Sequence, residues 1–163
     1  MDGAPVTGVA LVQPTRRRAW ELRRGDELVA ELCLSMFKRG ARARIGEREL
    51  EIRAHGTLRP EHVIVDAATQ EELARVRGRT VELEGGERAE WKSLGRGRGF
   101  SLVGPDGEPW LRGKVRSGLV RTSGEIEVAD GHEVALPALL AAYLLVRRAE
   151  QAAASASGAI VVT

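Results

Sequence analysis

The stretch Val134-Ala-Leu-Pro-Ala-Leu-Leu-Ala-Ala-Tyr-Leu-Leu-Val146 is apolar at every position, and this segment decides the fold. Pro137 suits the first turn of a helix, where no backbone N–H is needed. Arg147 and Arg148 follow toward the C-terminal half, where the helix dipole favours positive charge. A helix that is apolar on all sides is buried in protein or in a membrane. Its 13 apolar residues fall short of the ~20 needed to cross a bilayer, so we predict a buried helix over about 134–153.

From about residue 16 onward, the rest of the chain alternates apolar and polar residues with a period of two. Trp20 and Leu22 share one face, and a turn at Gly25-Asp26 leads into the next run. Runs of this kind continue as far as Ile126–Val128. Turns such as Pro105-Asp106-Gly107 separate them, because proline presets φ and glycine supplies a positive φ. Many short strands between regular turns are typical of a barrel or a sandwich.

Strands followed by one apolar helix predict a mainly β fold, a closed antiparallel barrel of about 12 strands around a buried C-terminal hydrophobic helix. Similar hairpins that recur roughly every 40 residues leave a propeller open as a weaker alternative. We expect residues 1–15 to form a flexible N-terminal arm, because they lack periodicity and contain prolines. The barrel domain then covers 16–154, and residues 155–163 form a C-terminal tail that frays or adds a short strand.

The composition fits one globular domain. The chain has 163 residues, of which 43% are hydrophobic and 29% charged, and its formal net charge is +2. Its single cysteine, Cys33, excludes an internal disulfide framework and a cysteine-based zinc site. We find no signal peptide pattern and no transmembrane segment, so the expected location is cytoplasmic.

Signals for catalysis are weak, so the sequence predicts no enzyme, no metal and no cofactor. His55, His62 and His132 lack the spacing of metal ligands and are expected at turns or on the surface. Cys33 alternates with leucines on a strand and is interpreted as a structural thiol. The glycine-rich run Gly95-Arg-Gly-Arg-Gly99 lacks the spacing of a phosphate loop, so a hairpin connection is favoured.

Clusters of basic residues are the only feature of the sequence that indicates a function. The candidate lipid-binding residues are Lys38, Arg39, Arg42, Arg44, Arg112, Lys114 and Arg116. The last three alternate along one strand, so we expect all three to project from one face. Such a row can contact lipid head groups or nucleic-acid phosphates. Nucleic acid ranks below lipid, because exposed aromatic platforms are not evident. A solvated face whose basic residues pair with glutamates is the stronger alternative.

Three stretches also carry a family resemblance. They are Val63-Ile-Val-Asp66 leading to Leu73-Ala-Arg-Val76, Phe100-Ser-Leu-Val-Gly-Pro-Asp-Gly107 leading to Trp110-Leu111, and the run Leu136–Val146. In these stretches the chain resembles the tubby C-terminal-like superfamily, especially its compact bacterial, LURP-one-related and phospholipid-scramblase-like members. The resemblance covers about residues 16–154. It implies a twelve-stranded closed barrel around a central hydrophobic helix, and phosphoinositide binding through basic residues on the barrel surface.

The chain also departs from the scramblase-like members. It has no cysteine-rich palmitoylation cluster, no calcium-loop pattern and no proline-rich N-terminal extension, which argues against lipid scrambling. We therefore expect a non-enzymatic binding module for anionic phospholipid or phosphoinositide head groups, peripheral at a membrane surface. A protein-interaction scaffold is the alternative. A lipid-processing enzyme and a nucleic-acid binder rank below both.

Overall fold

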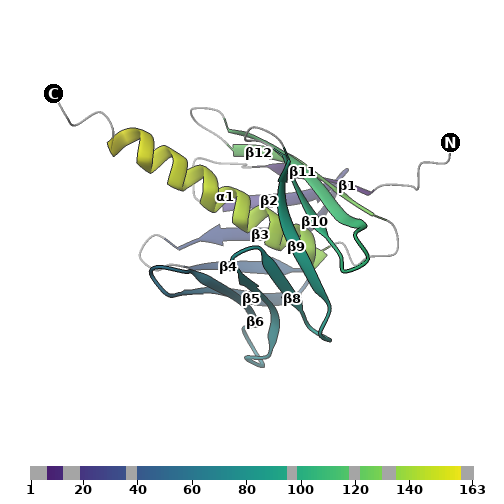
Figure 1. Cartoon of the computed structure of the whole chain (residues 1–163). Helices are drawn as coiled ribbons and strands as arrows, with labels where there is room; N and C mark the ends of the chain where they lie inside the picture. The colour runs from purple at the N-terminus through teal and green to yellow at the C-terminus, as the bar shows by residue number, and fades with distance from the viewer. Residues whose placement is uncertain are drawn as a thin grey trace.

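The computed structural model describes residues 7–12, 19–35, 40–94, 99–117, 122–129 and 135–158. Twelve strands precede one helix along the chain (Figure 1). The strands are β1 (Thr7–Val12), β2 (Ala19–Arg24), β3 (Glu27–Leu34), β4 (Gly40–Ile45), β5 (Arg48–His55), β6 (Glu61–Asp66), β7 (Glu72–Arg77), β8 (Thr80–Leu83), β9 (Arg88–Leu94), β10 (Gly99–Val103), β11 (Pro109–Ser117) and β12 (Thr122–Val128), and the helix is α1 (Ala135–Gly158). The mainly β prediction with one C-terminal helix is confirmed.

Strands β2 to β12 form one antiparallel sheet of eleven strands, in which each strand pairs with the next along the chain. The flexible arm expected over residues 1–15 is wrong for its central part, because residues 7–12 form β1. This strand pairs with β12 on one side and with β2 on the other. The backbone N–H and C=O groups of β1 therefore bond to the last strand, β12, and to β2. The side-chain pattern of residues 7–12 does not predict these backbone partners.

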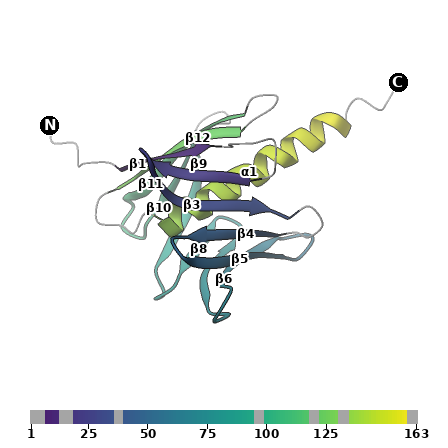
Figure 2. The same cartoon turned by 180° about the vertical axis from the view of Figure 1, so that it is seen from behind.

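The sheet curves around α1. The helix runs between β9–β11, which lie in front of it in Figure 1, and β3, which lies in front of it in Figure 2. Side chains from Ala138 to Tyr143 are at most 1% exposed on every side of the helix, so the predicted buried helix is confirmed. It extends to Gly158, five residues beyond the predicted end at 153. In the part of the chain that the structure describes, no helix is long and apolar enough to span a membrane.

The alternation of apolar and polar residues along the strands decides which side chains form the core. On β2, Trp20 and Leu22 are buried while their neighbours are not, which is the period of two expected for a strand with one solvated face. Phe100 on β10 lies opposite Gly113 on β11 and stacks on Trp91, with ring centroids 4.6 Å apart and an interplanar angle of 6°. The phenyl ring therefore occupies the space above a residue that has no side chain.

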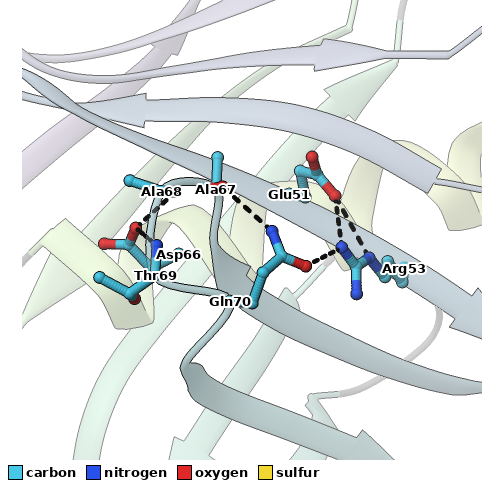
Figure 3. A network of polar contacts seen from close by, with 7 residues as sticks. All are labelled: Glu51, Arg53, Asp66, Ala67, Ala68, Thr69 and Gln70. Carbon is cyan, nitrogen blue, oxygen red and sulfur yellow. Dashed lines mark hydrogen bonds and ion pairs between the residues drawn. The ribbon is translucent and has the colours of Figure 1, made fainter.

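The β6–β7 connection shows how polar side chains fix a turn (Figure 3). The Asp66 carboxylate accepts hydrogen bonds from the backbone N–H groups of Ala68 and Thr69, at 2.8 and 3.1 Å. Gln70 adopts a positive φ of 63°, and its side-chain oxygen accepts a hydrogen bond from Arg53 of β5 at 2.5 Å. This turn lies at the end of β6, and it holds β5, β6 and β7 together there.

Candidate functional site

The basic residues predicted to bind lipid do not gather on one surface. Arg42 and Arg44 lie on β4, whereas Arg112, Lys114 and Arg116 lie on β11. These two strands are not neighbours in the sheet. Two further candidates, Lys38 and Arg39, lie outside the described residues.

The row on β11 also faces carboxylates. Arg112 lies opposite Glu127 of β12, Lys114 lies opposite Glu125, and all four side chains are exposed. Arg116 follows further along the same strand. Opposite charges directly across a strand pair stabilise each other. The outer face of β11 and β12 is therefore one of mixed charge, as the alternative reading of the sequence expected.

The same arrangement recurs on β4. Arg42 lies opposite Glu51 of β5. Arg44 lies between Glu49 of β5 and Glu31 of β3, and its guanidinium forms an ion pair with Glu31. Neither row provides the carboxylate-free patch that binding to an anionic surface would favour.

Figures 1 and 2 show where α1 leaves the sheet. A different group of side chains meets at this edge. We call this edge the exit rim. It comprises the beginnings of β4 and β6, the ends of β5, β7 and β9, and the helix residues Arg147 and Arg148. A pocket of about 420 Å³ opens there. Its lining residues are Ala54, Gly56, Thr57, Pro60, His62, Gly78, Trp91, Tyr143, Leu144, Arg147 and Arg148.

His62 and Tyr143 form the floor of this pocket. The Nδ1 atom of His62 lies 3.0 Å from the Tyr143 hydroxyl, and the two rings meet edge to face with centroids 5.2 Å apart. Tyr143 is fully buried and His62 is half-buried. Burial lowers the pKa of His62, and the positive charge of Arg147 lowers it further. His62 is therefore neutral near pH 7.

The expected turn or surface position of His62 is wrong. The residue is the second of β6, and its side chain points toward α1, 81 positions away in sequence. His55 is exposed, as predicted. His132 lies outside the described residues, so its expected position stays a prediction. Among the described side chains, no three of the types His, Cys, Asp and Glu gather as metal ligands would.

Two consecutive arginines frame the mouth of the pocket. The Arg147 guanidinium lies 5.5 Å from the centre of the Tyr143 ring, a cation–π contact, and its Nη2 donates to the Gly40 carbonyl oxygen at 3.1 Å. Arg148 is exposed and donates from Nη1 to the Ser93 hydroxyl at 3.1 Å. Neighbouring helix residues point about 100° apart, so the two arginines reach different strands across the rim.

The charged side chains among the described residues that line this pocket are all basic. They are Arg147 and Arg148, next to the titratable His62, and the described lining residues include no Asp or Glu. In the sequence, the two arginines indicate only the C-terminal half of the helix. The signal that could have found them is their position, because the first charged residues after a buried apolar run must lie where the helix emerges.

Two remaining expectations concern single features. Cys33 alternates with buried Leu32 and Leu34 on β3 as predicted, and its side chain is exposed; its interpretation as a structural thiol stays a prediction. The glycine-rich run from Gly95 to Gly99 joins β9 to β10, which pair antiparallel with Leu94 opposite Gly99. This pairing confirms the hairpin connection, although residues 95–98 themselves lie outside the described residues.

Comparison with protein families, with characterised proteins and with solved structures found no match for this chain.

Proposed function

We propose that this chain is a non-enzymatic binding module for anionic phospholipid head groups at a membrane surface, and that the pocket at the exit rim takes the phosphate. The observation that supports this most is the charge of that pocket, whose described lining residues include Arg147 and Arg148 but no Asp or Glu. The guanidinium group suits phosphate, because it donates two parallel hydrogen bonds to a planar or tetrahedral anion.

Arg147 and Arg148 have different roles in this proposal, because they differ in burial. Arg147 is half-buried between Tyr143 and the backbone of Gly40, so it supplies a positive charge held in place by these two contacts. Arg148 is exposed, and its hydrogen bond to Ser93 is a surface contact that exchanges with water at little cost. Arg148 is therefore the side chain that turns to an incoming phosphate.

We further propose that the sheet is a closed barrel of the tubby type. The register of β1 supports this, because Val9 lies opposite Ile126 of β12 and Leu11 lies opposite Leu22 of β2. The helix inside the sheet agrees with the same architecture. In a closed barrel the paired strands surround the helix, so the exit rim is an opening whose edge is fixed by the sheet.

The test compares one arginine of the exit rim with one of the β11 row. We expect Arg148→Gln to weaken co-sedimentation with vesicles of phosphatidylcholine and phosphatidylserine about fivefold, the loss of about 1 kcal/mol per basic residue near an anionic surface. Arg112→Gln is the matched control and should leave binding unchanged, since Glu127 already faces that residue. Binding should also weaken as salt increases, because screening shortens the reach of exposed charges.

Each other outcome has a clear meaning. Loss of binding in Arg112→Gln with retention in Arg148→Gln would move the site to the β11 row. Failure of the unmodified protein to bind anionic vesicles or a soluble inositol phosphate at low salt would overturn the proposed function and favour the protein-interaction scaffold. That alternative has little support so far, since the exposed large apolar side chains of the described residues, Val12, Leu28 and Leu58, lie on separate elements.

A further inference from the structure

The β5–β6 loop carries the most exposed large apolar side chain in the described part of the chain. Leu58 is 96% exposed, whereas the other exposed large apolar residues, Val12 and Leu28, are 39% and 38% exposed. A single exposed leucine on a protein surface is ordinary and carries no argument alone. Its position relative to the exit rim supplies the argument.

Leu58 lies on the same rim as the basic pocket. Gly56, Thr57 and Pro60 of its loop line that pocket. A second hollow of about 710 Å³ lies directly beside it, lined by Leu58, Arg59 and further residues of β6 and β7. The two hollows share Pro60, His62, Gly78 and Leu144, so they adjoin each other, and residues of the loop line both.

The loop is built to hold its tip in place. Strands β5 and β6 pair up to His55 opposite Glu61, immediately before and after the loop. Gly56 has a φ of +82°, and a Cβ atom there would lie 2.9 Å from the carbonyl oxygen of Arg59. Pro60 restricts φ at the other end. The tip therefore extends from a paired hairpin instead of folding back onto the protein.

We infer that Leu58 is an apolar anchor that enters the interfacial region of an anionic phospholipid bilayer when the exit-rim pocket holds a head group. This inference rests on the proposed function and specifies which face of the protein meets the membrane. An apolar tip next to a basic pocket matches the order of layers in a bilayer, where acyl chains lie just beneath the phosphates. Arg59, exposed beside Leu58, lies at the level of the phosphates in this orientation.

The first experiment separates the bilayer from the head group. We expect Leu58→Asn to weaken partition into phosphatidylcholine–phosphatidylserine vesicles about tenfold, which corresponds to about 1.4 kcal/mol. Calorimetric binding of a soluble inositol phosphate should not change, because no acyl chain is present. Leu28→Asn, on β3 and away from the rim, is the matched control and should bind both probes as the unmodified protein does.

The second experiment reports insertion directly. The fluorescence spectrum of Leu58→Trp should shift to the blue when the same vesicles are added. The spectrum of the unmodified protein should not shift, because its three tryptophans are buried. Unchanged vesicle partition of Leu58→Asn, or a Leu58→Trp protein that co-sediments without a blue shift, would overturn the anchor while leaving the head-group pocket standing. Failure of the unmodified protein to bind either probe would overturn both proposals.

Discussion

At the scale of single residues, His62 shows how a buried contact sets a charge state. Its lowered pKa means that the folded protein binds a proton less readily than the unfolded chain does. Protonation therefore favours the unfolded chain as the pH falls below about 6.5, the ordinary value for histidine. We expect the midpoint of thermal unfolding to fall between pH 7 and pH 5, and His62→Gln to reduce that fall. An identical pH dependence in the two proteins would contradict this account.

Gly113 is the second residue whose role depends on one neighbour. A Cβ atom there would lie 2.1 Å from Cζ of Phe100, whose ring is buried and already stacked on Trp91. We expect Gly113→Ala to lower the free energy of unfolding by roughly 1–3 kcal/mol, as overpacked cores do. Gly8→Ala on β1 is the control, since its Cβ would meet nothing within 4 Å. Urea unfolding measures both, and equal effects would show that Phe100 moves aside freely.

At the scale of secondary-structure elements, α1 is both the centre of the core and the wall of a pocket. Leu140 is 1% exposed, whereas Leu144 is half-buried at the exit rim. We expect Leu140→Ala to cost roughly 2–5 kcal/mol, because truncation in the core leaves a cavity. Leu144→Ala should cost less, since water can fill the space at the rim. Equal losses in denaturant unfolding would mean that the two ends of the helix are equally enclosed.

At the scale of the whole molecule, charge is distributed in two ways. On the strands, arginines and glutamates face each other across neighbouring strands, as Arg112 and Glu127 do. At the exit rim, Arg147 and Arg148 come from one helix and donate to Gly40 of β4 and Ser93 of β9, and the described residues that line the pocket beside them include no Asp or Glu. The exit rim therefore concentrates positive charge where the two strand rows do not, and this contrast is the basis of the comparison between Arg148→Gln and Arg112→Gln.

The local features of the fold follow from the sequence alone. The alternation around Trp20 and Leu22 predicts a strand with one buried face, and the apolar run from Val134 to Val146 predicts a buried helix. Both predictions are confirmed, because the period of a strand or helix decides which side chains share a face, whatever surrounds them. Turns such as Pro105-Asp106-Gly107 are equally local, and Gly107 has the predicted positive φ of 86°.

The tertiary structure alone decided which elements become neighbours. Residues 7–12 form a strand because both β12 and β2 offer backbone partners. Arg112 and Lys114 share a face as the alternation predicts, but the register with β12 places glutamates opposite them. His62 meets Tyr143 because the sheet wraps around the helix. A periodic pattern fixes the direction of a side chain, whereas its partners depend on register and on the path of the chain, which are set by the packing of the whole molecule.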